Sequence, residues 1–164
     1  MKEIRAITDD NTSALQTNLD ATYEFTEKGV VKNRIHAARL DQYGGENPYV
    51  EATGGLQMTF FDSAFVEVAS LASDAGTFYQ KEKRMIAWGN VVLGNTKGEK
   101  LETSRLVYEQ DSARISSDQF VKITSGYGVF YGKGLIANEN FTEYKILQPT
   151  GDIYFEESQS PIPE

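Results

Sequence analysis

The chain has 164 residues, 40% hydrophobic and 24% charged, which suits a single folded domain. Lys and Arg number 16 against 24 Asp and Glu, and the net charge of −8 repels nucleic acid, so we expect no nucleic-acid partner. The absence of cysteine excludes disulfides, thiolate metal sites and a cysteine nucleophile, and no apolar run approaches the roughly 20 residues of a membrane helix.

The two ends of the chain are polar. Residues 1 to 20 are rich in Asp, Asn and Thr and lack a sustained apolar period, which predicts a loosely ordered N-terminal arm. Residues 155 to 164 contain Ser, Glu and Pro in the same manner and predict a flexible C-terminal tail. The predicted domain therefore spans residues 21 to 154.

Alternation of apolar and polar residues predicts half-buried strands within this domain. The runs, in chain order, are Tyr23/Phe25, Leu56/Met58/Phe60, Val66/Val68, Val121/Ile123 and Thr142/Tyr144/Ile146. Clusters of Gly, Asn and Asp separate the runs and leave little room for helices. The best helical candidate is residues 63 to 75, but Phe65-Val66-Glu67-Val68 within it fits a strand equally well. The sequence thus predicts an all-β domain of many short antiparallel strands.

A weak internal repeat supports this interpretation. An aliphatic residue follows seven positions after Tyr43, Tyr79, Tyr108 and Val129, and in the last three copies another apolar residue follows five positions later. Residues at this odd spacing share a face only across a bulge or corner, for example at Gly89-Asn90. Alternatively the strands run straight, and Ile115 shares its face with Val121. Such repeats are typical of a sandwich, a jelly roll or a β-solenoid.

The sequence contains no catalytic constellation. The only histidine, His36, has no His or Cys to share a metal with and is expected on the surface. The glycine-rich residues 126 to 134 lack the Gly-Lys-Ser/Thr ending of a phosphate loop. The densest basic cluster, Lys81-Glu82-Lys83-Arg84, is expected to form a solvated turn, with contact to a ligand phosphate as the alternative. We expect a binding or scaffold module with no enzymatic activity, catalytic residue, metal or cofactor.

Two stretches carry a family resemblance. Residues 85 to 103, which include Met85-Ile86-Ala87-Trp88-Gly89-Asn90-Val91-Val92, resemble the OstA-type β module of lipopolysaccharide export. The continuation, from Leu106-Val107-Tyr108 to Gly132-Lys133-Gly134-Leu135 and Phe141, is similar in order and spacing to the LptC family. The resemblance covers residues 20 to 147. It implies a twisted, open β-jelly roll that carries lipid.

The resemblance also implies a function. The protein would accept lipopolysaccharide from subunits of the inner-membrane lipopolysaccharide ABC transporter and pass it to an LptA-like periplasmic bridge protein. The implied location is the periplasm, with an anchor to the inner membrane in a segment absent from this chain. An apolar groove would hold the acyl chains, since each buried methylene contributes roughly 0.8 kcal/mol. Its expected lipid-binding residues are Leu56, Met58, Phe60, Val66, Val68, Ile86, Trp88, Ile115, Val121, Ile123, Tyr144 and Ile146.

Open strand edges usually have a partner to pair with. The candidate partner-edge residues are Tyr23, Phe25, Phe141, Tyr144 and Ile146. By family analogy the N-terminal edge would meet the transporter and the C-terminal edge the bridge protein. Three alternatives stay open: the apolar residues only fill a sealed core, the protein is itself a soluble LptA-like bridge, or it is a structural or carbohydrate-binding module. Sugars would then stack on Tyr127, Phe130 and Tyr131.

Overall fold

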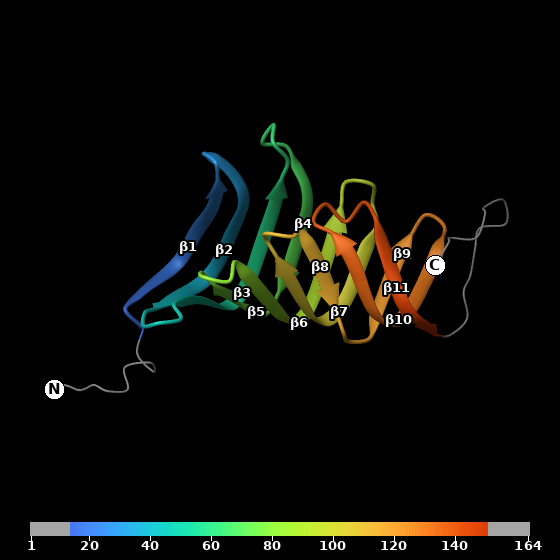
Figure 1. Ribbon diagram of the computed structural model, residues 1–164. Coiled ribbons are helices and arrows are strands. Elements are labelled where there is room, and N and C mark those ends of the chain that lie inside the picture. The colour runs from blue at the N-terminus through green and yellow to red at the C-terminus, as the bar shows by residue number, and fades with distance from the viewer. Residues whose placement is uncertain (1–13, 151–164) are drawn as a thin grey trace.

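The computed structural model describes residues 14–150, which form one antiparallel sheet of eleven strands and contain no helix (Figure 1). The strands are β1 (Gln16–Glu27), β2 (Val30–Tyr43), β3 (Tyr49–Phe61), β4 (Glu67–Ser73), β5 (Ala75–Tyr79), β6 (Arg84–Asn95), β7 (Lys100–Glu109), β8 (Arg114–Ser117), β9 (Val121–Ser125), β10 (Gly128–Asn138) and β11 (Tyr144–Thr150). The predicted all-β jelly-roll class is confirmed.

The predicted terminal segments fall mostly outside this range. The predicted tail, residues 155 to 164, and residues 1 to 13 of the predicted arm lie outside the described residues. β1 begins at Gln16, so the sheet starts before the predicted domain boundary at residue 21. The helical candidate at residues 63 to 75 is not a helix: Phe65 and Val66 lie in a turn, and β4 begins at Glu67, so the strand alternative holds only for Glu67 and Val68.

The sheet consists of two halves that share their long strands. Residues 49–52 of β3 pair with β5, whereas residues 56–61 pair with β4. β10 behaves in the same way, because its first half pairs with β9 and its second half with β8. We call the half that contains β5 and β8 half-sheet A, and the half that contains β4 and β9 half-sheet B. β1, β2 and β3 are 12, 14 and 13 residues long, because each runs through both halves.

A line of irregular residues, which we call the seam, separates the two half-sheets. Gly54 and Gly55 of β3 have φ values of 78° and 109°, and Gly89 and Asn90 of β6 have 84° and 50°. Asp74, between β4 and β5, joins these strands: its N–H donates to Gly89 O at 2.8 Å, and its carbonyl accepts from Gly55 N–H at 3.0 Å. Left-handed residues and bulges bend strands, so the seam turns one half-sheet toward the other.

The bend decides which residues share a face. Leu101 and Leu106 of β7 are both buried although five positions separate them, which only a corner in the strand permits. The bulge expected at Gly89-Asn90 is present, but it does not place Ile86 and Val91 on one face: Val91 is buried in the core and Ile86 is only half-buried. However, Ile115 is buried with Val121, while Phe120 is 57% exposed. Ile115 therefore shares its face with Val121, as in the alternative without a bulge, although β8 and β9 are separate strands.

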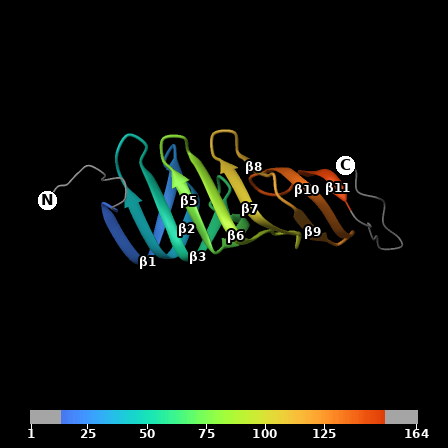
Figure 2. The ribbon, with the colours of Figure 1, turned by 90° about the horizontal axis from the view of Figure 1, so that it is seen from below.

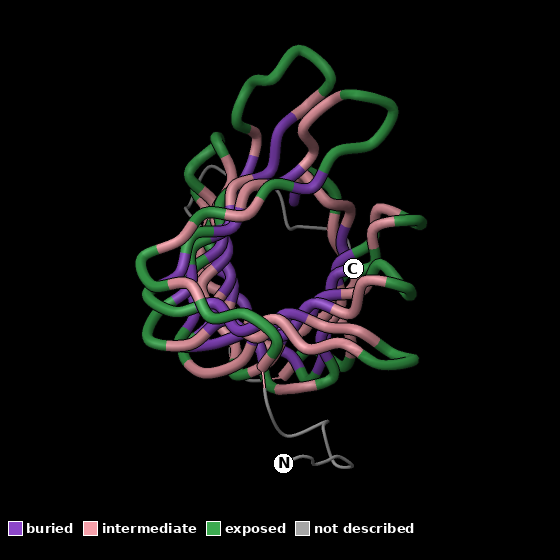
Figure 3. The backbone as a smooth tube through the Cα atoms, turned by 90° about the vertical axis from the view of Figure 1, so that its left-hand side faces the viewer, coloured by how far each residue is buried: buried purple, intermediate pink, exposed green. Residues whose placement is uncertain are grey.

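The curled sheet surrounds one apolar core (Figure 3). The turns after β1, β3, β6 and β9, residues 28–29, 62–66, 96–99 and 126–127, end half-sheet B along the top of Figure 1, and we call them the first rim. The turns after β2, β5, β7 and β10, residues 44–48, 80–83, 110–113 and 139–143, end half-sheet A and form the second rim. We call the side of the molecule between the two rims the mouth. β1 and β11 lie at opposite ends of the long axis (Figure 2).

Candidate functional site

The interior of the curled sheet is a continuous apolar core. It begins at Phe25 of β1, includes side chains from every strand from β1 to β10, and ends at Phe141, with Tyr144 and Ile146 of β11 packed against it. The core is closely filled. A cavity of about 10 Å³, lined by apolar side chains such as Ile35, Leu56 and Met85, is close to the space that one water molecule needs.

Most of the expected lipid-binding residues belong to this interior. Six are buried in the core: Leu56, Met58, Phe60, Ile115, Val121 and Ile123. Three more are half-buried and pack against it: Val68, Tyr144 and Ile146. Where apolar and polar residues alternate, as with Gln57 and Thr59 between the apolar residues of β3, the alternation predicted which side chains face the core; lipid contact at these residues stays a prediction.

Three of the expected lining residues lie elsewhere and are corrected. On β6 the buried residues are Met85 and Ala87, so Ile86 and Trp88 are half-buried on the outer face. Residues 85 to 88 are all apolar, so no alternation with polar residues indicates which of them face the core. Val66 is 55% exposed in the turn between β3 and β4, where its N–H donates to Asp62 Oδ1 at 3.0 Å.

Sequence reasoning also missed several interior residues. Met85, Leu93, Leu101, Leu106, Tyr108 and Leu135 are all at most 2% exposed. The sequence shows apolar residues two or five positions apart around these residues. Which of them face the core depends on where the seam bends the strand.

The candidate edge residues turn their side chains inward. Phe25 packs on Phe78 of β5 with ring centroids 4.0 Å apart, and the Tyr23 hydroxyl accepts a hydrogen bond from Gln80 Nε2 at 3.0 Å. Phe141 is fully buried in the second rim and stacks on Tyr144 at 4.8 Å. β1 and β11 each pair on one side only within the described residues. Their unpaired backbone groups therefore form the two free edges.

A partly buried polar cluster joins the two rims. From β2, beside the first rim, Lys32 Nζ lies 3.2 Å from Glu139 Oε2 of the second rim, and Asn33 Nδ2 donates to the Tyr108 hydroxyl at 3.4 Å. The Tyr108 hydroxyl donates to Glu139 Oε1 at 2.8 Å, and its ring packs edge-on against Phe60 at 5.1 Å. Burial raises the pKa of Tyr108; the Asn33 hydrogen bond opposes this and the Glu139 carboxylate adds to it.

A second cluster joins the rims closer to β11. Asn95 Nδ2, at the end of β6, donates to Phe141 O at 2.6 Å. The Tyr144 hydroxyl donates to Glu99 Oε2 of the first rim at 3.1 Å. Burial raises the pKa of Tyr144, and the negative charge of Glu99 adds to this effect. Both clusters consist of side chains that reach across the mouth.

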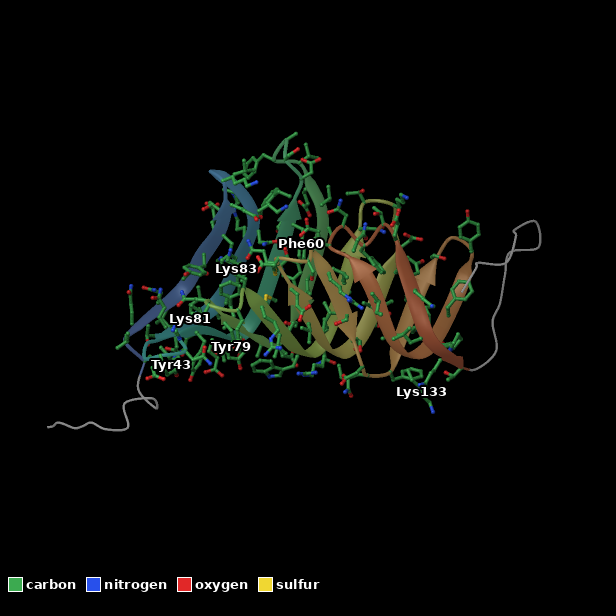
Figure 4. All side chains as sticks on the ribbon, in the orientation of Figure 1. Tyr43, Phe60, Tyr79, Lys81, Lys83 and Lys133 are labelled. Carbon is green, nitrogen blue, oxygen red and sulfur yellow. The ribbon has the colours of Figure 1, made fainter. Side chains whose placement is uncertain are left out.

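The basic turn and the histidine lie outside the interior. His36 is exposed on the outer face between Thr22 and Asp20, as expected. Residues 80–83 form the turn between β5 and β6, where Lys83 lies 3.7 Å from Asp111. Figure 4 shows Lys81 and Lys83 in the β1 half of the molecule and Lys133 projecting away from the sheet near the β11 end.

The three candidate sugar-stacking aromatics do not share one exposed platform. Tyr127 is 43% exposed, but Phe130 is 5% exposed in the β10 interior face. Tyr131 stacks on Phe120 with ring centroids 5.7 Å apart. This arrangement leaves Tyr127 as the exposed member of the three.

Comparison with known proteins points to one family. A family model described as "Lipopolysaccharide-assembly, LptC-related" matches residues 2–150. None of the curated proteins compared with the chain matches it. Within residues 14–150, no helix has the length and apolar character to cross a membrane.

Proposed function

The chain belongs to the LptC-related family of lipopolysaccharide-assembly proteins, and we propose that it is a periplasmic carrier that holds the acyl chains of lipopolysaccharide inside its curled sheet. Membership of the family implies a non-enzymatic role in lipopolysaccharide transport. The resemblance found in the sequence is thereby confirmed.

The observation that supports this carrier role is the continuity of the apolar core. Core residues run without a break from β1 at one free edge to Phe141 and β11 at the other. An acyl chain that moves along such a path stays out of water, and each methylene kept from water contributes roughly 0.8 kcal/mol.

The free edges support the proposed partners. β1 would add to a β-strand of the inner-membrane lipopolysaccharide ABC transporter, and β11 to an LptA-like periplasmic bridge protein. Pairing through backbone groups requires no particular side chain at the edge, which agrees with edge side chains that pack inward. We place the carrier in the periplasm, held at the inner membrane by an anchor outside the described residues.

Site-specific photo-crosslinking tests the carrier role. A photo-reactive amino acid at Ile115 or Ile123, both 0% exposed, should crosslink to purified lipopolysaccharide. The same residue at Lys122, which lies between two buried neighbours and faces outward, or at Ile86 on the outer face of β6, should not. Circular dichroism would confirm that each variant is folded. Absence of crosslinks at both interior positions in folded protein would refute lipid binding in the interior.

A soluble bridge of the same pathway is the second candidate, because both ends of the sheet have a free edge. Such a bridge would pair β11 of one copy with β1 of the next and grow into filaments. Light scattering across a range of protein concentrations distinguishes the two roles. A mass that rises steadily with concentration favours the bridge, and a constant mass favours the carrier.

A further inference from the structure

The apolar interior is closed to lipid in this structure. Its cavity of about 10 Å³ holds no more than a water-sized group, and Ile115, Val121 and Ile123 are 0% exposed. Packed interiors of this kind do not deform continuously, so an acyl chain can enter only if some elements separate. Given the proposed lipid-carrier function, some contacts around this interior must break before an acyl chain enters.

The two sides of the curled sheet are held in different ways. At the seam, backbone hydrogen bonds connect the strands, such as those that Asp74 makes with Gly89 and Gly55. Across the mouth, side chains make the connections, through Lys32–Glu139, Asn33–Tyr108–Glu139, Asn95–Phe141 and Tyr144–Glu99. Side-chain contacts can exchange for water without breaking a strand ladder. Separation at the mouth would therefore leave every strand ladder intact, whereas separation at the seam would break backbone hydrogen bonds.

One of these clusters is incompletely satisfied. Asn33 is 1% exposed, and its Oδ1 atom has no hydrogen-bond partner although the neighbouring Nδ2 donates to Tyr108. A buried oxygen without a partner is unfavourable, and opening the mouth would hydrate it. Lys32 and Glu139 would also gain hydration, since their side chains are already 28% and 18% exposed. Hydration of these groups offsets part of the free energy lost when the apolar core opens.

We propose that the cluster of Lys32, Asn33, Tyr108 and Glu139, with the neighbouring pairs Asn95–Phe141 and Tyr144–Glu99, is a latch that closes the mouth over the empty interior. Acyl chains enter when the latch releases and the two half-sheets separate about the seam. Gly54, Gly55 and Gly89 lie at that hinge, and left-handed φ values there allow the backbone to bend with little steric hindrance.

A reversible crosslink across the mouth tests the latch. The chain contains no cysteine, so the double variant Lys32→Cys/Glu139→Cys can be joined by a short, reducible bifunctional thiol reagent that reacts at no other position. Binding of purified lipopolysaccharide should fall at least tenfold in the crosslinked protein and return after reduction. The matched control is Lys83→Cys/Asp111→Cys, whose native side chains lie 3.7 Å apart on adjacent turns of the second rim. Crosslinking this control should leave binding unchanged.

Weakening the latch should have the opposite effect. Tyr108→Phe removes the hydroxyl that contacts Asn33 and Glu139 but keeps the ring that packs on Phe60. Stopped-flow uptake of a fluorescent acyl probe should become several-fold faster. Spin labels at Lys97→Cys and Glu143→Cys, exposed positions on opposite rims, should report a broader distance distribution in the Tyr108→Phe background.

The outcomes separate the latch from the carrier function. If the crosslinked Lys32/Glu139 variant binds lipopolysaccharide as well as its reduced form, the latch is refuted and the carrier function stands. If the reduced and wild-type proteins also fail to bind, the carrier function is refuted and the latch with it. Loss of binding that reduction reverses, with the Lys83/Asp111 control unaffected, supports both.

Discussion

At the scale of single residues, the face that a side chain occupies determines its role. In β6, Met85 and Ala87 belong to the core, whereas Ile86 and Trp88 lie on the outer face although they are equally apolar. Ile115 of β8 is fully buried and faces the core. The same substitution should therefore have different consequences at Ile86 and Ile115.

Truncation of the two isoleucines measures this difference. Ile115→Ala should lower the free energy of unfolding by about 2–5 kcal/mol, because it leaves a cavity in the closed interior. Ile86→Ala removes the same atoms from a half-buried site and should cost only about 1 kcal/mol. Urea unfolding followed by circular dichroism provides both values. Equal losses would show that both residues occupy similar environments.

The raised pKa of Tyr108 predicts an alkaline loss of stability. Because the pKa in the folded protein lies above the ordinary value of 10.0, the folded state retains a proton that the unfolded state loses. The contribution to the free energy of unfolding is therefore complete below about pH 10 and declines as the pH rises above it. Urea unfolding at about pH 9, 10 and 11 should show this decline, and Tyr108→Phe should reduce it. An equally steep decline in the Tyr108→Phe protein would contradict this assignment.

At the scale of elements, the seam converts long strands into two facing half-sheets. Gly89 is central to it, since a Cβ atom placed there would lie 2.6 Å from Asp74 Oδ2 and 2.8 Å from Asp74 Cβ. Asp74 in turn hydrogen-bonds to Gly89 and Gly55 through its backbone, and accepts from Asn90 Nδ2 at 2.9 Å through its side chain. A side chain at position 89 would therefore disturb the junction of β4, β5 and β6.

A pair of glycine substitutions isolates this effect. Gly89 and Gly98 both have a φ of 84°, but a Cβ atom at Gly98 would meet nothing within 4 Å. Gly98→Ala should lower the free energy of unfolding by about 1–2 kcal/mol, which is the cost of the left-handed backbone alone. Gly89→Ala should cost about 1–3 kcal/mol more because of the crowding with Asp74. Equal losses in urea unfolding would indicate that Asp74 moves aside freely.

At the scale of the whole molecule, the elongated sheet has two different free ends. β1 and β11 lie at opposite ends of the long axis, and the apolar core connects them (Figure 2). Free edges of this length invite strand addition, and the proposed function assigns one partner to each edge. A photo-reactive residue on one edge at a time tests this assignment.

Photo-crosslinking from exposed edge positions tests the two partners. A photo-reactive residue at Thr22 on β1 should capture transporter subunits, and one at Lys145 on β11 should capture the bridge protein, in cells or in a mixture of purified components. Lys100 is also exposed but belongs to β7, which has neighbours on both sides, and should capture neither. Capture of both partners from one edge would contradict the assignment.

The sequence by itself determined the all-β class, the family, and the inward residues of strands that alternate cleanly. Leu56, Met58 and Phe60 were predictable because each polar neighbour marks the opposite face of the strand. The exposed position of His36 followed from the same local pattern. These features depend on residues within one strand, so short stretches of sequence contain the necessary information.

Only the tertiary structure decided which residues of a uniformly apolar stretch face the core, where the seam runs and how the mouth is closed. Residues 85 to 88 have no polar residue to indicate a face, so packing against β5 and β7 selects Met85 and Ala87 for the core. Asn33 and Tyr108 are 75 positions apart, and Lys32 and Glu139 are 107 positions apart. No local pattern connects residues so distant in sequence. Their contacts exist because the sheet curls and brings the two rims together.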